Sequence, residues 1–146
     1  MKRIVTVQDI SCLGKCSLTV ALPIISAMGI ETSIIPTAVL STHTLWEHYV
    51  CDDLTDNIPL VAEHWKNEGF GFDAIYTGYL ASSNQIDVVS KLFDEFKTEN
   101  NFIFVDPAMA DNDEMYRNFD KSFADKMRVL LSLIHISEPT RPEPIS

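Results

Sequence analysis

Four polar segments of this chain follow short apolar runs and carry side chains that could do chemistry. They are Gln8-Asp9-Ile10-Ser11, Ser41-Thr42-His43-Thr44, Thr77-Gly78-Tyr79 and Asp106-Pro107-Ala108-Met109-Ala110-Asp111. The last segment holds two carboxylates across a proline-bearing turn. Carboxylate oxygens are the hard ligands that Mg²⁺ prefers. The other three segments offer a carboxylate, hydroxyls, an imidazole and a phenol to a small polar molecule.

The hydrophobic pattern predicts the elements that position these segments. β-rich or apolar runs predict strands over 3–8, 33–40, 72–77 and 101–105. Apolar residues at helical spacing predict helices over 18–28, 57–68, 83–96 and 119–129. The alternation predicts an α/β fold, a Rossmann-like three-layer sandwich with a mostly parallel sheet. Ligands bind outside the carboxyl ends of such strands, so the four polar segments are expected at one rim.

Three local details follow from the same pattern. Ser17 is expected to cap the first helix, and Ser82 or Ser83 the third. The segment 41–53 is expected to be irregular. The second helix is expected to bury one stripe, formed by Leu60, Val61, His64 and Trp65.

Composition limits the class of protein. The 146 residues are 46% hydrophobic, enough for one domain with a core. The net charge of −10 opposes a nucleic-acid partner, because phosphate backbones need a basic face. We expect neither a signal peptide nor a membrane span, since no apolar run approaches about 18 residues. Three cysteines form no disulfide framework and suggest a reducing cytoplasm.

The end of the chain differs from the rest. The run LSLIHISEPTR resembles a translation of the transposon-adapter DNA used in preparing sequencing libraries, and Pro139, Pro142 and Pro144 permit neither helix nor central strand. The expectation is that residues 130–146 are a non-native, disordered tail and that the natural protein continues past about Val129. The alternative is a natural proline-rich tail.

Three runs carry a family resemblance: VQDISCLGKCSLTVALPIISAMGIETSIIPTAVLSTHT, YTGYLAS and FVDPAMAD. They resemble pyridoxal (pyridoxamine) kinases of the ribokinase superfamily, from Lys2 to about Val129. The resemblance implies a ribokinase-like fold of which residues 1–129 are the N-terminal half. It implies phosphorylation of the 5′-hydroxymethyl group of pyridoxal, pyridoxine or pyridoxamine in vitamin B6 salvage. ATP and Mg²⁺ would be required, a monovalent cation is left open, and the parent would be a cytoplasmic homodimer.

The resemblance also implies contacts to the substrate ring. Asp9 stands where the family places a polar residue, commonly Ser, on the pyridine ring. Its carboxylate would accept from the ring hydroxyl or pair with a protonated ring nitrogen; the structural alternative is a solvated loop acid. Cys16 would line the ring pocket or act as a small buried hydrophobe. Tyr79 would wall the ring or be a core tyrosine, and Tyr49 corresponds loosely to a second aromatic wall.

Two further ring contacts fall after the second predicted strand. Thr44 matches a threonine that contacts the substrate. His43 could bond the polar edge of the ring, although a lone histidine is more often a satisfied structural group.

The phosphate side of the site is implied at the fourth segment. Asp106 and Asp111 match the DPVMGD motif, whose acids face the ATP phosphates and Mg²⁺. Asp111 would hold the metal, directly or through water, or else cap a helix. Ala110 stands where the family prefers glycine, and this changes the geometry that the loop can adopt.

The general base of the family, an Asp in a GTGD-like motif, is absent from this sequence, so no catalytic residue is assigned and the chain itself is expected to be inactive. Two alternatives stay open: a hydroxymethylpyrimidine kinase of the same superfamily, and a non-catalytic flavodoxin-like module that binds a small ligand. A zinc site from Cys12, Cys16 and a histidine is disfavoured, because no second ligand pair follows. The parent's partners are therefore expected to be small molecules, with no nucleic acid and no membrane.

Overall fold

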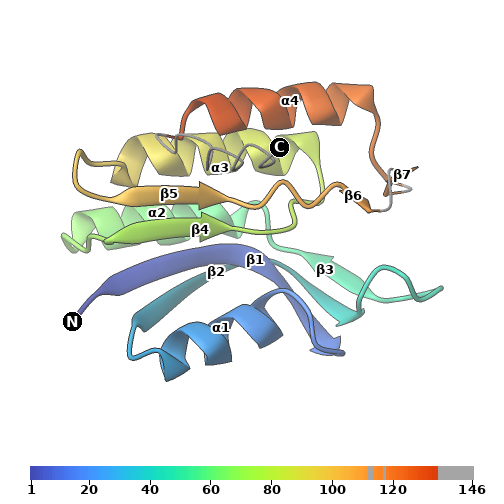
Figure 1. The fold of residues 1–146 in the computed structure, drawn as a ribbon, viewed down its shortest axis with the longest axis horizontal. Coiled ribbons are helices and arrows are strands. Elements are labelled where there is room, and N and C mark those ends of the chain that lie inside the picture. Colours follow the sequence, from blue (N-terminus) through green and yellow to red (C-terminus); the bar gives the residue numbers. More distant parts are fainter. Residues whose placement is uncertain (112–113, 117, 135–146) are drawn as a thin grey trace, which may run out of the picture.

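The computed structural model describes residues 1–111, 114–116 and 118–134 (Figure 1). A five-stranded sheet has the order β3-β2-β1-β4-β5, and a separate two-stranded ribbon pairs β6 with β7. The strands are β1 (Arg3–Leu13), β2 (Glu31–Thr42), β3 (Cys51–Asp53), β4 (Ala74–Thr77), β5 (Phe102–Val105), β6 (Ala110–Asp111) and β7 (Glu114–Met115). The helices are α1 (Leu18–Ala27), α2 (Asn57–Asn67), α3 (Ser83–Phe96) and α4 (Lys121–Ser132).

The sheet is mostly parallel, which confirms the predicted α/β class. β1 pairs in parallel with β2 and with β4, and β4 pairs in parallel with β5. Only β3 is antiparallel, against residues 38–40 of β2. The prediction that 41–53 is irregular is therefore wrong for residues 41–42, which end β2, and for residues 51–53, which form β3. β2 extends far enough to offer β3 a free edge, and Ser41 Oγ accepts a hydrogen bond from Val50 N at 2.9 Å just before β3 begins.

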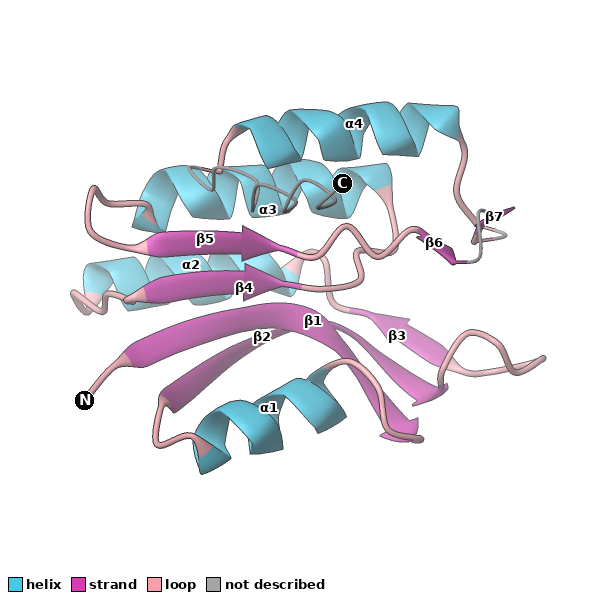
Figure 2. Cartoon of the chain, viewed as in Figure 1, coloured by secondary structure: helices cyan, strands magenta, loops and turns pink. Residues whose placement is uncertain are grey.

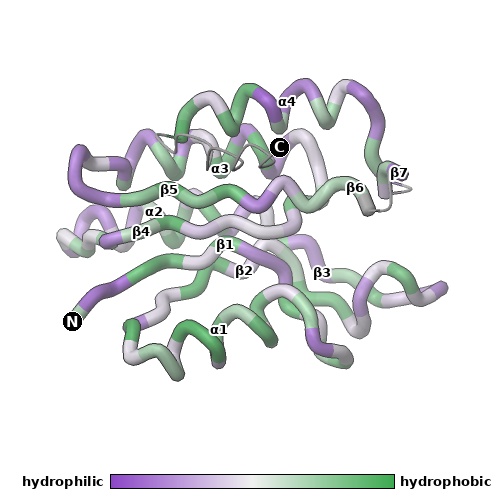
Figure 3. The backbone as a smooth tube through the Cα atoms, in the orientation of Figure 1, coloured by the Kyte–Doolittle hydropathy of each residue, from purple (hydrophilic) through white to green (hydrophobic). Residues whose placement is uncertain are grey.

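The helices form layers on the two faces of the main sheet (Figure 2). α1 packs against β1 and β2 on one face, while α2, α3 and α4 lie on the other. α1 contains no charged residue and appears mostly apolar in Figure 3, yet its own Ile24 remains 56% exposed. None of the described helices has the length and apolar run needed to cross a bilayer.

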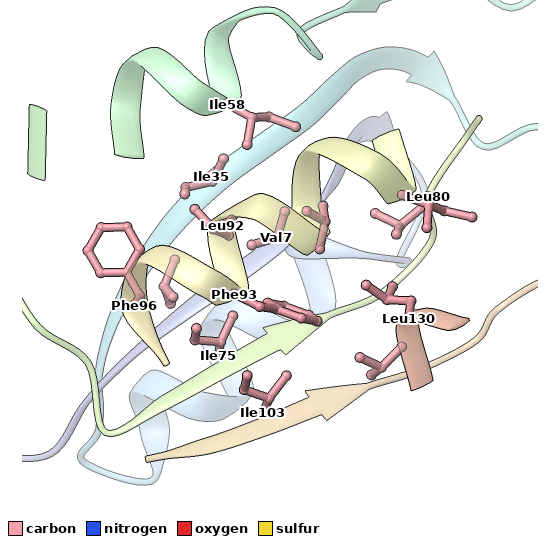
Figure 4. Packing of buried hydrophobic residues seen from close by; sticks show 14 of the residues in the cluster. Val7, Ile35, Ile58, Ile75, Leu80, Leu92, Phe93, Phe96, Ile103 and Leu130 are labelled. Atoms are coloured by element: carbon pink, nitrogen blue, oxygen red, sulfur yellow. The ribbon is translucent and has the colours of Figure 1, made fainter. Parts of the chain in front are cut away.

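The core lies between the sheet and α3 (Figure 4). α3 presents one apolar face at helical spacing, and Phe93 at its centre is 1% exposed. Ser82 caps this helix as predicted, because its Oγ accepts a hydrogen bond from Gln85 N at 3.2 Å. The strands supply Val5, Val7, Ile35, Ile75, Ile103 and Val105 to the same core.

α2 buries only part of the predicted stripe. Val61 and Trp65 pack partly against the core as predicted, but Leu60 is 61% exposed and His64 is also exposed. The fully buried residues of α2 are instead Ile58 and Ala62. Ala62 lines a small cavity of about 100 Å³ between α2 and α3. Both stripes fit a helical period, and the small side chain of Ala62 allows α2 to approach α3. The packing partner, rather than the period, selects the buried face.

α4 crosses the predicted boundary between residues 129 and 130. Leu130 is 1% exposed and continues the buried stripe of Phe123 and Met127 at helical spacing. Leu133 and Ile134 pack partly against the core. The predicted disorder therefore does not hold for residues 130–134, because their apolar side chains suit the face that α4 already buries. Residues 135–146 lie outside the described part of the chain.

We predict that Phe93→Ala lowers the free energy of unfolding by about 3–5 kcal/mol, because it removes a fully buried ring from the core. Phe102→Ala is the matched control, since Phe102 is 72% exposed. It should change stability by no more than about 0.5 kcal/mol. Urea denaturation followed by circular dichroism measures both. Equal losses would show that α3 does not organise the core.

Candidate ligand site at the carboxyl ends of the strands

The order of the strands reverses between β1 and β4. The chain moves from β1 outward to β2 and β3, and then crosses back to place β4 on the other side of β1. In open α/β sheets the crevice outside the carboxyl ends at such a reversal is the usual ligand site. Val7 pairs with Thr77 at this point, and Asp9 and Tyr79 each lie two residues further on. The topology therefore sets Asp9 and Tyr79 beside the crevice.

Gly78 allows the chain to leave β4 close against β1. A Cβ atom at this position would lie 2.7 Å from the Gln8 side chain. Gln8 is 3% exposed, and its Nε2 donates a hydrogen bond to Thr6 Oγ1 at 2.8 Å, so it cannot easily move aside. Gly78 N also donates to Val7 O at 3.2 Å. Only glycine gives Tyr79 this approach to β1.

A shift in strand register sets the position of Asp9. Gln8 pairs with Pro36 but Ile10 pairs with Val39, so β2 carries one extra residue beside Asp9. Irregularities of this kind re-aim side chains and are common near active sites. Asp9 is 5% exposed, and Ser11 Oγ donates only a long hydrogen bond of 3.4 Å to its Oδ2.

Buried polar atoms without hydrogen-bond partners concentrate at the carboxyl-terminal end of the strands. Within the described residues, the buried side-chain atoms without a hydrogen-bond partner include Asp9 Oδ1, Thr42 Oγ1 and Thr77 Oγ1. All three lie in the carboxyl-terminal halves of their strands. The fourth such atom, Arg3 Nε at the opposite end of the sheet, lies 2.9 Å from Glu31 Oε1, so its charge is paired although the hydrogen-bond geometry is poor. Buried polar groups normally have partners, and the exceptions mark this rim as a place for a ligand.

Tyr79 sits between Asp9 and an aromatic cluster. Its ring centroid lies 5.6 Å from that of Phe119 and 6.5 Å from that of Tyr116. Burial raises the pKa of Tyr79 above its usual range, and Tyr49 and Asp9 add to that rise. The structure thus brings Asp9, Tyr49 and Tyr79 within electrostatic reach of one another, as a ring site would need. Tyr116 lies outside the predicted elements, and Phe119 was predicted only as the first residue of the last helix, so the sequence did not indicate that either ring would contact Tyr79.

Two cysteines approach the same region. Ser17 forms an antiparallel bridge with Ile10, and this returns the neighbouring Cys16 to β1 at the level of Ser11, two residues beyond Asp9. Ser17 occupies the N-cap position as predicted, but its side chain makes no capping hydrogen bond. The pKa of the Cys51 thiol is raised, first by desolvation and then by the negative charges of nearby acids, Asp9 among them. A raised pKa makes Cys51 a poor nucleophile.

His43 and Thr44 lie further along the strands. β1 and β2 remain paired as far as Leu13 and Thr42, roughly 13 Å beyond Asp9 at the rise of an extended chain. His43 Nε2 accepts a hydrogen bond from Trp46 Nε1 at 3.1 Å. An indole can only donate, so the imidazole proton resides on Nδ1, and the 3.4 Å contact from Leu45 N to Nδ1 is not a hydrogen bond. His43 thus has a local structural partner, and the structure does not bring it to Asp9.

Asp106 is exposed directly after β5, and its N–H donates a hydrogen bond to Thr77 O at 3.0 Å. This bond places the Asp106 turn beside the end of β4. Burial raises the pKa of Tyr76, and the charge of Asp106 raises it further. Asp111 lies in β6, but its side chain is outside the described residues. No group of three potential metal ligands occurs in the described part of the chain. Mg²⁺ commonly takes one or two carboxylates together with substrate phosphates, so Asp106 fits as one contributor.

Gln85 is a buried residue that we did not predict. It is 0% exposed, and its Nε2 donates hydrogen bonds to Thr37 O at 3.2 Å and Thr55 Oγ1 at 2.9 Å. Its Oε1 accepts from Ala81 N at 2.8 Å, two residues after Tyr79. The available signal was the spacing Ser82-x-x-Gln85 of a capping box, in which the glutamine folds back over the helix start. Gln85 therefore ties the Tyr79 loop to β2.

No protein-family model and no curated protein matches the chain. Solved structures do match. A candidate phosphomethylpyrimidine kinase from Bacteroides thetaiotaomicron is 43% identical, with a TM-score of 0.88 over 91% of this chain and 46% of that one. An orthorhombic form of that protein was crystallised with pyridoxal. Pyridoxal kinase from Lactobacillus plantarum is 29% identical, with a TM-score of 0.81 over 89% of this chain and 46% of that one.

The resemblance to ribokinase-superfamily kinases is confirmed. Pyridoxal kinase from Leishmania donovani in complex with ADP and ginkgotoxin shares the fold, with a TM-score of 0.83 at 18% identity, over 92% of this chain and 48% of that one. The chain spans about half the length of the solved structures it matches. The fold shared with these structures covers about nine-tenths of the chain, in which the strand order reverses between β1 and β4.

We predict that Gly78→Ala lowers the free energy of unfolding by about 1–3 kcal/mol, because the new methyl group must displace the buried Gln8 side chain. Gly71→Ala is the matched control, since nothing lies within 4 Å of a Cβ there. Chemical denaturation compares the two variants. A loss no larger than that of the control would show that β4 does not leave the sheet in close contact with Gln8.

Alkaline pH should also report on Tyr79. Its pKa is raised in the folded chain, so above about pH 10 the unfolded chain loses its proton more readily, and stability falls as pH rises. Tyr79→Phe should flatten that fall, whereas Tyr116→Phe, which removes an exposed hydroxyl, serves as the control. Urea denaturation between pH 8 and about 11 measures the slopes. Identical slopes for all three proteins would contradict the buried position of the phenol.

Proposed function

We propose that this chain supplies the ring-binding half of a kinase that transfers a phosphoryl group from ATP to the 5′-hydroxymethyl group of a B6 vitamer. The observation that carries the proposal is the buried Asp9 carboxylate at the point where the strand order reverses between β1 and β4: its Oδ1 has no hydrogen-bond partner among the described residues, and its charge acts on Tyr79. The 43% identity to a protein crystallised with pyridoxal supports a planar hydroxymethyl heterocycle as the ligand.

In this proposal each side chain does what its position allows. Tyr79 offers an aromatic surface to the ring, and Asp9 accepts a hydrogen bond from a donor on its edge. Cys16 closes the pocket from the turn after β1, while His43 and Thr44 contribute from the extension of β2. Since these last two lie far along the strands from Asp9, their contribution depends on the size of the substrate.

The phosphate side rests on the turn after β5. Asp106, with Asp111 further along the chain, would face the ATP phosphates and hold Mg²⁺ directly or through water. Mg²⁺ neutralises charge on the transferring phosphoryl group when bound. Support for a nucleotide comes from the Leishmania donovani pyridoxal kinase, which was solved with ADP. Cytoplasmic location and a homodimeric parent belong to the same proposal.

Hydroxymethylpyrimidine is the second candidate substrate. The relative at 43% identity is named as a candidate phosphomethylpyrimidine kinase, although it also crystallised with pyridoxal. Both rings are planar and both carry a hydroxymethyl group, so the fold alone cannot separate them. The domain assignment, with residues 1–129 as part of a kinase and 130–146 as an added tail, is part of the proposal. Long sequencing reads across the codons for residues 127–146 would test the origin of the tail.

We predict that the purified chain binds pyridoxal but makes no pyridoxal phosphate above blank when ATP and Mg²⁺ are added. It lacks a GTGD-like motif to supply the general base. Isothermal titration measures binding, and absorbance of the phosphorylated product measures turnover. The heat-denatured chain is the control for binding, and an active pyridoxal kinase is the control for the assay.

The outcomes separate the candidates. Clear turnover would contradict the view that the chain carries only half of the catalytic machinery. Binding of hydroxymethylpyrimidine without pyridoxal would favour the second candidate. A folded chain that binds neither ring but binds flavin mononucleotide would favour the flavodoxin-like module.

A further inference from the structure

We propose that Asp9 is a specificity-determining residue that selects a cationic, N-protonated heteroaromatic ring over a neutral ring of the same shape. The inference rests on the proposed function, because it names the chemical form of the ligand that the same crevice would accept. It is carried by the burial of the Asp9 carboxylate, its unpaired oxygen and the charges around it.

The first step is the cost of the carboxylate itself. Asp9 is 95% buried, as its 5% exposure shows, and its Oδ1 has no hydrogen-bond partner among the described residues. The one donor to Oδ2, Ser11 Oγ, lies 3.4 Å away and is neutral. A buried charge normally requires both a countercharge and hydrogen bonds. Asp9 has no countercharge and only one long hydrogen bond among the described residues. We therefore infer a partner that supplies a positive charge and a hydrogen bond together.

The second step is the sign of the surroundings. The ion pairs of the described residues are Lys2–Asp73, Arg3–Glu31, Lys126–Asp87 and Arg128–Asp125, and none of them includes Asp9. The charge of Asp9 reaches both Tyr79 and Cys51, whose pKa values it raises. Asp52 and Asp53 act on Cys51 in the same direction. The groups facing Asp9 are therefore neutral or negative, and this favours a cation.

The third step is the kind of cation. The described residues hold no cluster of three metal ligands, so a bound metal ion is disfavoured at Asp9. Tyr79 offers an aromatic surface on the other side of the crevice, which suits a planar ring. A neutral donor on that ring would satisfy one lone pair of Asp9 and leave the charge uncompensated. A protonated ring nitrogen supplies a hydrogen bond and a countercharge through one atom, and such charge-assisted bonds are the stronger kind.

The register shift between β1 and β2 fixes the backbone position of Asp9, and this determines where on a ligand the hydrogen-bond donor must lie. The extra residue on β2 lies where Asp9 leaves the regular ladder, so the carboxylate is held by backbone and not by a flexible loop. Ser11 and Asp9 lie on the same face of β1, but the 3.4 Å contact from Ser11 Oγ to Oδ2 is too long to hold the carboxylate, and Oδ1 has no partner among the described residues. A rigid acceptor of this kind binds most tightly a ring whose donor lies at one particular position.

The test compares three ligands on the full chain by isothermal titration, at a mildly acidic pH that protonates the ring nitrogen of both pyridines. Pyridoxine has a basic ring nitrogen and a 3-hydroxyl group, 3-deoxypyridoxine keeps only the nitrogen, and the carbocyclic analogue of pyridoxine keeps only the hydroxyl. We expect the carbocyclic analogue to bind about 10-fold more weakly than pyridoxine or worse, and 3-deoxypyridoxine to retain most of the affinity. Asp9→Asn should reduce the difference between pyridoxine and its carbocyclic analogue to less than about threefold. Ser11→Ala, the matched control, should preserve it.

Thermal melting adds a readout that distinguishes a ligand role from a structural one. Asp9→Asn and Asp9→Ser should melt at or above the temperature of the unmodified chain, because each removes an unpaired buried charge. A marked loss of melting temperature in both variants would overturn the inference, since the carboxylate would then be stabilising the fold.

The ligand series also separates this inference from the proposed function. If pyridoxine binds and its preference over the carbocyclic analogue survives in Asp9→Asn, the inference about Asp9 fails while the kinase proposal stands. If the loss of the 3-hydroxyl costs more affinity than the loss of the ring nitrogen, Asp9 reads a neutral donor and the inference is overturned. If no ring binds to a folded chain, both fail together.

Discussion

The parallel pairing of β1 on both of its sides is the constraint on which the rest of this structure depends. β1 bonds β2 along one edge and β4 along the other, and the order of strands reverses between β1 and β4. That reversal leaves a crevice above the last shared pair, Val7 and Thr77. The acid and the aromatic ring at the centre of the proposal, Asp9 and Tyr79, each lie two residues beyond this pair, and Asp106 reaches the same level from the end of β5. The close fit of Gly78 over Gln8 is the local consequence, because the two strands part within a residue of that pair.

A buried polar network holds this arrangement at the neighbouring strand. Thr37, beside the extra residue in β2, has a carbonyl oxygen that accepts hydrogen bonds from Leu54 N at 3.0 Å, next in register after β3, and from Gln85 Nε2 at 3.2 Å. Gln85 then reaches Ala81, so the irregularity beside Asp9 and the loop that carries Tyr79 are fixed by the same side chain. Fully satisfied networks of this kind rigidify a site. The contrast with Asp9 is informative: Gln85 is saturated with partners within the chain, whereas the acid it helps to position is left with an open one.

The sequence was sufficient for the alternation of strands and helices, because apolar runs and helical stripes are local properties. It was also sufficient for the four polar strand exits, since a parallel sheet collects carboxyl ends at one rim. It was insufficient for the buried face of α2, where Ile58–Ala62 and Leu60–His64 both fit the helical period and only the approach of α3 decides between them. It was also insufficient for the distance between His43 and Asp9, because the sequence does not show that β1 and β2 continue well past the rim. The burial of Leu130 was missed for another reason: the origin of a segment does not determine whether its side chains fit an existing apolar face.

β5 bears on the proposal that the chain is half of a kinase. Its run Phe102–Val105 is apolar on both faces, which is typical of a strand buried inside a parallel sheet. In this structure it lies at the edge: Ile103 and Val105 are buried against the helices, while Phe102 and Phe104 are 72% and 53% exposed. Among the described residues, the aromatic partner of Phe104 is Tyr76, tilted against it at 5.3 Å between ring centroids, and α1 packs on β1 and β2. An edge strand with exposed aromatic side chains is prone to aggregation when it stays unpaired. The same side chains become buried when further strands and helices extend the sheet. The pattern of β5 therefore favours a wider sheet, which agrees with relatives about twice as long as this chain.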